Sequence, residues 1–266
     1  QQYAALAQGQ ASSGQPLRIN FEIDVGLHRG GISTASTLAL MLDMFKVNPH
    51  LQWSGLMGYD AHVGKLPLAS MRADALQHVH QVYKTMLGVC ETRFAPFNPA
   101  PTLNIGGSPT YRLHDGSASA NDLALGSALL KPSDFDSDLL SDLQPACFIA
   151  TPVIKAQTPF QMPYGVEGLG TLARTWDTNQ QQAYFIYGGN WLADPVSPPG
   201  LQASGLYGNS SNQQVLLGSG LQALKPDDFI FMRPRQSEAV LLQFGAIAVL
   251  ENNKISSFWE PMAALP

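Results

Sequence analysis

The chain has little charge and no strongly basic segment. Asp, Glu, Lys and Arg make up 13% of its 266 residues, about half of the roughly 25% that is usual for soluble domains. We therefore expect a partner subunit to cover part of the surface. The formal net charge of −5 leaves no electrostatic footprint for binding a nucleic acid or an anionic membrane.

Cysteines and long apolar runs are also scarce. Cys90 and Cys147 cannot form a disulfide framework or a four-cysteine zinc site, so we expect a reducing compartment and a cytoplasmic location. The longest apolar stretch, Ala239–Leu250, contains Gln243 and is too short to span a bilayer. The chain starts without Met or a signal peptide, and Gln1–Gln10 has the composition of a helix already in progress. We therefore expect the natural N-terminus to lie upstream.

The first half of the chain alternates strand and helix patterns, which predicts βα units with parallel strands. Helices are expected over Gln1–Gln10, after Ser33 or Thr34 as the N-cap, and over Met71–Leu87. Strands are expected over Leu17–Val25, Leu51–Met57, Thr102–Ile105 and Asp122–Leu130, and each ends in glycine or polar residues. The chemistry of a βα barrel lies at such strand ends. Four strands cannot close an eight-stranded barrel, so about half a barrel is unaccounted for.

The second half has short strand patterns separated by turns rich in proline and glycine. The expected strands are Cys147–Ile154, Ala183–Tyr187, Gln214–Leu217, Asp228–Arg233, Ala239–Leu250 and Lys254–Trp259. The segment Glu251–Lys254 is typical of a hairpin turn. We predict two domains, a partial barrel over residues 1–140 and a β-rich C-terminal domain over residues 141–266.

Four segments, each at an expected strand end, resemble the motifs of one family. They are Phe21–Gly31 (FEIDVGLHRGG), Gly55–His62 (GLMGYDAH), Gly106–Tyr111 (GGSPTY) and Asn121–Ser127 (NDLALGS). In this order they are similar to fold-type III pyridoxal-phosphate enzymes, the alanine racemase-like family. Within the family they most resemble the D-threonine aldolase and D-serine dehydratase branch. The resemblance implies an α/β fold: the second half of a (β/α)8 barrel, its last four strands, followed by a mostly β domain.

The resemblance also implies a function. It implies a pyridoxal-phosphate-dependent amino-acid lyase or racemase acting on a small D- or β-hydroxy-amino acid. The reaction would be aldol cleavage, dehydration with deamination, or racemisation, through an aldimine carbanion. In the family the Schiff-base lysine ends the first barrel strand, which here would precede Gln1, and no lysine of this chain has a matching context. We therefore expect the chain to be the C-terminal two-thirds of a longer protein, which the resemblance implies to be a homodimer.

Two loops are predicted to bind the cofactor phosphate. Gly107, Ser108 and Thr110 follow the third strand, where glycines let backbone N–H groups approach the anion and the hydroxyls donate further hydrogen bonds. By resemblance, Gly126 and Ser127 hold the same phosphate from the other side.

Three residues are predicted to be catalytic. By resemblance, Arg29 hydrogen-bonds the phenolic oxygen of the cofactor, a task that suits a planar and permanently charged guanidinium. Tyr59 matches the position that flanks the pyridine ring, so both residues also count as cofactor-binding. His62 is predicted to contact substrate or transfer protons, because histidine titrates near neutral pH.

Two departures from the family concern the cofactor nitrogen and a metal. Ala124 stands where the alanine racemase branch has an arginine that contacts the pyridine nitrogen. Gln236, Ser237 and Glu238 stand where the aldolase branch has a His-Cys-Asp metal motif. Such a set is a poor zinc site, although Glu238 with waters suits a harder cation. We therefore predict that no metal is resident, and we leave open whether a divalent cation binds at Glu238. Gln236 and Glu238 are instead expected to bind substrate.

Two alternatives remain open. The first is a non-catalytic protein that keeps the pyridoxal-phosphate site without turnover, against which the β-rich second half argues. The second is an unrelated βα-barrel hydrolase. It ranks last, because the sequence has no Ser-His-Asp order and no paired-carboxylate motif.

Overall fold

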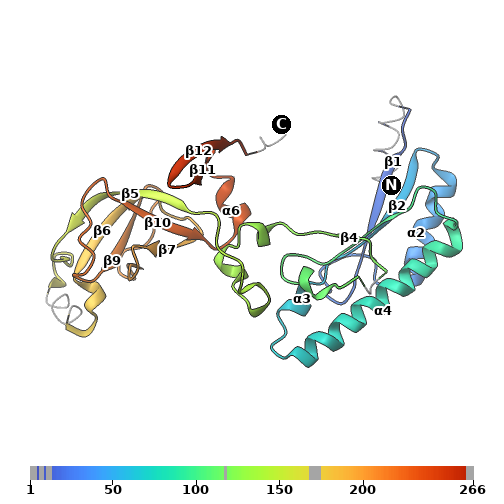
Figure 1. Ribbon diagram of the computed structural model, residues 1–266, viewed down its shortest axis with the longest axis horizontal. Coiled ribbons are helices and arrows are strands. Elements are labelled where there is room, and N and C mark those ends of the chain that lie inside the picture. The colour runs from blue at the N-terminus through green and yellow to red at the C-terminus, as the bar shows by residue number, and fades with distance from the viewer. Residues whose placement is uncertain (1–4, 6–8, 10–13, 117–118, 168–174, 262–266) are drawn as a thin grey trace. The chain divides into compact units, whose positions relative to one another are not determined.

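The computed structural model describes residues 5, 9, 14–116, 119–167 and 175–261. It divides into two compact units (Figure 1). The first comprises Gln1–Leu129 and Ser137–Ser141, and the second comprises Leu130–Asp136 and Asp142–Pro266. The predicted boundary after residue 140 falls in this interleaved stretch. Apart from positions 5 and 9, the helix predicted over Gln1–Gln10 lies outside the described residues.

The first unit is a parallel four-stranded sheet of order β1-β2-β3-β4. The strands are β1 (Leu17–Ile23), β2 (Leu51–Gly58), β3 (Thr102–Ile105) and β4 (Asp122–Leu123). The helices are α2 (Ala35–Val47), the short α3 (Ala61–Gly64) and α4 (Ala69–Phe94). Together with the β-rich second unit described below, this arrangement confirms the predicted fold class. β4 is shorter than predicted, because only Asp122 and Leu123 pair with β3.

The core of the first unit lies between its sheet and the helices α2 and α4 (Figure 1). Alternate residues of β1 are buried, while α2 buries Leu38 and Leu42. The predicted N-cap is confirmed at Thr34, whose hydroxyl accepts the N–H of Thr37 at 3.1 Å. Such a cap satisfies one of the free donors in the first turn of the helix.

A close approach between β2 and β3 depends on Gly55. A Cβ at this position would lie 1.8 Å from the carbonyl oxygen of Thr102, its partner in the ladder. Only a residue without a side chain allows this pairing. Because all four strands are parallel, their carboxyl ends lie at the same edge of the sheet.

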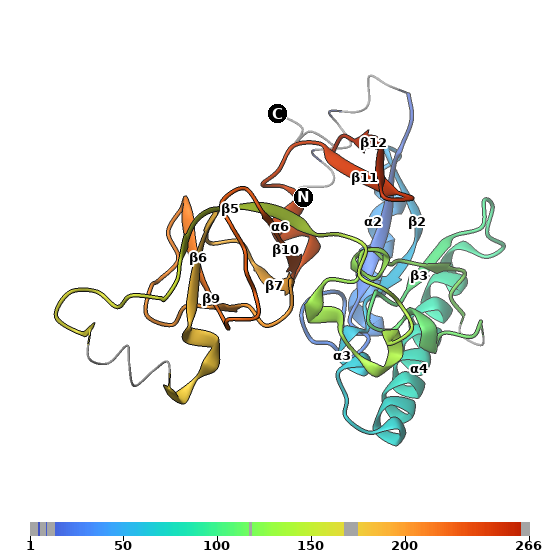
Figure 2. The same cartoon turned by 60° about the vertical axis from the view of Figure 1, so that its left-hand side comes forward.

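The second unit is a six-stranded antiparallel sheet of order β7-β10-β5-β6-β9-β8 (Figure 2). Its strands are β5 (Ile149–Gln157), β6 (Gln182–Tyr187), β7 (Ala193–Ser197), β8 (Gln202–Ala203), β9 (Gln213–Gly218) and β10 (Phe229–Pro234). Tyr184, Ile186, Leu216 and Ile230 are fully buried in its core. Sequence patterning missed β7 and β8, since one contains a proline and the other has two residues.

The prediction of one strand over Ala239–Leu250 is wrong for the first half of that segment. Helix α6 (Ser237–Leu241) begins after Gln236 and buries Val240. Only then does β11 (Ile247–Glu251) begin, paired with β12 (Lys254–Trp259). The glycine at 245 separates the two elements, and the apolar run alone does not distinguish a helix from a strand. The predicted hairpin turn is confirmed, with Asn252 and Asn253 at φ of 50° and 62°.

Short 3-10 helices complete the described secondary structure. They are η2 (Tyr111–Leu113), η3 (Ser127–Leu129), η4 (Ser133–Phe135), η5 (Asp138–Leu140) and η6 (Thr178–Gln180). Among the described helices, none combines the length and the apolar character that a membrane crossing needs.

Candidate functional site

Three of the predicted site residues lie in contact at the carboxyl edge of the parallel sheet. The guanidinium carbon of Arg29, after β1, lies 4.7 Å from the ring centroid of Tyr59, the residue after β2. A Cβ on Gly107, after β3, would lie 2.4 Å from Cε2 of Tyr59. The tyrosine ring therefore packs directly on the Gly107 backbone and occupies the space that a side chain at position 107 would need. The guanidinium of Arg29 packs on the same ring.

The turn that carries Arg29 is organised by Asp24. One oxygen of its carboxylate accepts the N–H groups of Gly26 and His28 at 3.0 Å, and the other lies 2.8 Å from Nδ1 of His28. Partial burial acts to raise the pKa of Asp24, but these hydrogen bonds outweigh it and hold the pKa below its ordinary value. Asp24 therefore pairs with His28, and the guanidinium of Arg29 faces the ring of Tyr59.

Ser108 joins the two loops that are predicted to bind phosphate. The residue is 7% exposed, and its Oγ accepts the N–H of Gly126 at 3.1 Å and the N–H of Ala128 at 3.0 Å. The structure thus brings Ser108 and Gly126 together, but they bind each other directly rather than through a shared phosphate. Direct binding of a phosphate by Gly126 and Ser127 stays a prediction.

The loop after β3 retains donors for an anion. Within the described part of the chain, the backbone N–H groups of Gly107 and Ser108 have no acceptor, although both residues are buried. The hydroxyl of Ser108 accepts two hydrogen bonds and keeps its own hydrogen for donation. Gly106, at φ of 81°, turns the chain so that these donors follow the strand end. Neighbouring N–H and O–H donors of this kind are the groups that bind phosphate in proteins.

Thr110 is committed to a partner within the protein. Its hydroxyl donates to Oδ1 of Asp60 at 2.5 Å. Oδ2 of Asp60 lies 2.8 Å from Nε2 of His114, and Nδ1 of His114 lies 3.4 Å from Nε2 of His80. A direct contact between Thr110 and phosphate stays a prediction. Sequence reasoning gave Asp60 and His114 no role, although an aspartate directly after a buried strand and Tyr59 was an available signal.

His62 lies in α3, next to the turn after β1. A Cβ on Gly26 would lie 3.2 Å from its Nε2, and its Nδ1 is buried without a hydrogen-bond partner in the described residues. Burial lowers the pKa of His62 and outweighs the opposing effect of Asp60. The imidazole is therefore neutral at pH 7, which is the form that can accept a proton.

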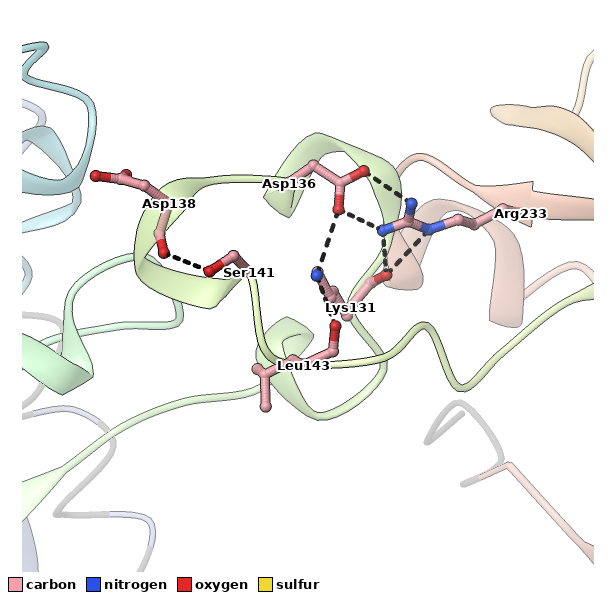
Figure 3. Close-up of polar contacts among 6 residues, drawn as sticks. All are labelled: Lys131, Asp136, Asp138, Ser141, Leu143 and Arg233. Atoms are coloured by element: carbon pink, nitrogen blue, oxygen red, sulfur yellow. Dashed lines mark hydrogen bonds and ion pairs between the residues drawn. The ribbon is translucent and has the colours of Figure 1, made fainter.

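Lys131 is a buried lysine in the second unit (Figure 3). Its Nζ donates to the carbonyl of Leu143 at 2.6 Å and lies 3.8 Å from Asp136. Arg233 binds the carboxylate of Asp136 with two contacts of 2.8 Å and also donates to the carbonyl of Lys131. This amine is thus part of the charge network that holds the second unit together.

Gln236 and Glu238, predicted to bind substrate, belong to the second unit. The amide of Gln236 donates to Oδ2 of Asp134 at 3.3 Å, and Glu238 is exposed on α6. Their contact with substrate stays a prediction. No group of three His, Cys, Asp or Glu side chains that could hold a metal occurs among the described residues. Ala124 directly follows β4, and its methyl group cannot donate a hydrogen bond.

Comparison with known proteins identifies the family. The model of the alanine racemase N-terminal domain matches residues 1–133, half of the chain. The chain belongs to this family. The resemblance of its strand-end motifs is thereby confirmed, while no curated protein matches the chain.

Solved structures of similar fold extend across both units. The D-threonine aldolase of Filomicrobium marinum is 14% identical with a TM-score of 0.75, and the match covers 97% of this chain and 66% of the aldolase. Alanine racemase of Bacillus anthracis is 12% identical with a TM-score of 0.67, over 97% of this chain and 70% of the racemase. D-threo-3-hydroxyaspartate dehydratase of Delftia sp. HT23 is 14% identical with a TM-score of 0.69, over 99% and 70%. At these identities the likeness establishes the fold alone, and this chain spans about two-thirds of the length of each structure.

Proposed function

We propose that the protein containing this chain is a pyridoxal-phosphate-dependent enzyme that acts on a small D- or β-hydroxy-amino acid. The observation that carries the proposal is the contact of Arg29, Tyr59 and Gly107 at three successive strand ends, beside the free donors of Gly107 and Ser108. Membership of the alanine racemase N-terminal domain family supports it. So do the names of the structural neighbours, which are a racemase, an aldolase and a dehydratase.

Each residue at the sheet edge has a task in this proposal. Bound pyridoxal phosphate supplies an electron sink for a carbanion at the substrate Cα. The N–H groups of Gly107 and Ser108 and the Ser108 hydroxyl donate to the phosphate oxygens. The ring of Tyr59, fixed against Gly107, supports the pyridine ring. Arg29 donates to the phenolic oxygen, and its permanent charge favours the ionised form.

His62 is the residue that we assign to proton transfer. Because burial keeps its imidazole neutral, it can take up a proton at a ring nitrogen near pH 7. Gln236 and Glu238 are proposed to hold the substrate. We also propose that the protein is a homodimer, which the low content of charged residues supports, and that it is cytoplasmic.

A substrate panel tests the proposal and separates its three reactions. The full-length protein, with added pyridoxal phosphate, is incubated with D-threonine, D-serine, D-threo-3-hydroxyaspartate and both enantiomers of alanine, with and without Zn²⁺ or Mn²⁺. Release of an aldehyde indicates aldol cleavage, release of a 2-oxo acid with ammonia indicates dehydration, and inversion indicates racemisation. A Tyr59→Ala variant is expected to lose cofactor binding and turnover together. Cofactor binding with no turnover on a wider D- and L-amino-acid panel would replace this proposal with a non-catalytic binding protein.

A further inference from the structure

The carboxylate of Asp60 is buried directly behind the strand-end site. Its side chain is 0% exposed and that of His114 is 3% exposed. One oxygen accepts the hydroxyl of Thr110 at 2.5 Å, and the other lies 2.8 Å from Nε2 of His114. Because a buried carboxylate is unfavourable unless it is fully hydrogen-bonded, these contacts strongly restrain the groups that make them.

The two partners of Asp60 flank one short turn. Thr110 precedes η2 and His114 follows it. The same turn holds the carbonyl of Gly107, which accepts the N–H groups of Thr110 and Tyr111, both at 2.9 Å. Asp60 therefore anchors both ends of the turn that fixes the direction of the Gly107 carbonyl.

The direction of this carbonyl determines the direction of a candidate phosphate donor. The Gly107 carbonyl and the Ser108 N–H belong to one planar trans peptide, so they point in opposite directions. With the carbonyl directed into the turn, the Ser108 N–H points away from it, and it has no acceptor within the described residues. On the other side, Tyr59, the residue before Asp60, packs on Gly107. The end of β2 thus holds this peptide both through a ring contact and through a hydrogen-bonded turn.

We infer that Asp60 is a positioning residue that sets the affinity of the site for a phosphate monoester, by fixing the Gly107–Ser108 peptide through Thr110 and His114. The identity of the ligand as pyridoxal phosphate rests on the proposed function. Asp60 does not bind the phosphate itself, because both groups are anions and both carboxylate oxygens already have partners.

The test compares the affinity of variants for a ligand with a phosphate and for the same ligand without one. Dissociation constants of the full-length protein are measured for pyridoxal phosphate and for pyridoxal. Thr110→Val removes one hydrogen bond at nearly constant volume. Asp60→Asn keeps an acceptor for Thr110, whereas Asp60→Ala removes both contacts. Thr92→Val is the matched control, since the hydroxyl of Thr92 is exposed on α4 and donates only to the carbonyl of Gly88.

Thr110→Val is expected to weaken binding of pyridoxal phosphate by about tenfold, the effect of losing a hydrogen bond to a charged group. Pyridoxal has no phosphate, so its affinity is expected to stay within about twofold of wild type. That change is smaller than the loss of one ordinary hydrogen bond would cause. Asp60→Asn is expected to bind pyridoxal phosphate more tightly than Asp60→Ala, and Thr92→Val to match the wild type. If Asp60→Ala does not fold, the two dissociation constants of Thr110→Val alone test the inference.

Two results would overturn the inference while the proposed function stands. One is wild-type affinity for pyridoxal phosphate in Thr110→Val. The other is an equal loss of affinity for both ligands, which would indicate a general structural role. If the wild-type protein itself takes up no pyridoxal phosphate, the proposed function fails, and the inference fails with it.

Discussion

Replacing Gly107 with alanine tests the packing of Tyr59 on the loop after β3. The new Cβ would lie 2.4 Å from Cε2 and 3.1 Å from Cδ2 of the tyrosine ring. Carbon atoms pack at about 3.5 Å or more, so the ring must move by roughly 1 Å. Because the guanidinium of Arg29 lies against the same ring, the displacement disturbs two predicted cofactor contacts at once.

The expected loss of stability follows from overpacking at Gly107 and from the disturbed cation–π contact between Arg29 and Tyr59. Overpacking a close contact costs about 1–3 kcal/mol, and an exposed cation–π contact contributes about 0.5–1 kcal/mol. Gly107 does not have a positive φ, so alanine adds no backbone strain. We therefore expect Gly107→Ala to lower the free energy of unfolding by about 1–3 kcal/mol. We expect it to weaken binding of pyridoxal phosphate by about tenfold, the equivalent of 1.4 kcal/mol.

Urea unfolding and cofactor titration measure the two effects. Gly88→Ala is the matched control, because a Cβ at this position in α4 meets no atom within 4 Å, and alanine there is expected to stabilise the helix by about 0.5–1 kcal/mol. Wild-type stability and wild-type cofactor affinity in Gly107→Ala would refute the packing of Tyr59 on Gly107.

Two further predictions concern pH and the second unit. Burial lowers the pKa of His62 and of His80, so below about pH 6.5 the unfolded chain binds protons that the native protein does not. We expect the free energy of unfolding to fall from pH 7 to pH 5, and to fall less steeply in His62→Gln and His80→Gln; equal slopes in urea titrations would contradict this. Arg233→Met removes the two-contact ion pair with Asp136 and is expected to lower the free energy of unfolding by about 1–2 kcal/mol, since the Arg233 side chain is 13% exposed and that of Asp136 is 51% exposed. Arg235→Met, with one exposed ion pair, is expected to cost at most about 0.5 kcal/mol, and an equal loss in both variants would argue against the network.

Much of the fold could be predicted because its signals are local. The strand Thr102–Ile105 and the helix cap at Thr34 follow from residues close together in sequence, and both are confirmed. By contrast, β7 and β8 are strands only because other strands pair with them, β10 with β7 and β9 with β8. The run Ala239–Leu250 was misassigned because the same apolar residues suit a helix and a strand.

The candidate site divides in the same way. Patterning placed Arg29, Tyr59 and Gly107 at strand ends, and the parallel sheet brings them into contact. The pairing of Asp60 with Thr110 and His114 spans 50 and 54 residues. No local pattern encodes such a pairing, because it depends on how the loops after β2 and β3 fold against each other.

The absorption spectrum of the full-length protein, recorded with pyridoxal phosphate before and after borohydride, tests most directly whether these strand ends form a cofactor site. We predict a Schiff-base band near the visible edge that borohydride abolishes, with the reduced cofactor attached to a lysine outside residues 1–266. We also predict that Gly107→Ala needs about tenfold more cofactor to reach the same band. The absence of a band, with no uptake of added pyridoxal phosphate, would contradict the proposed cofactor site.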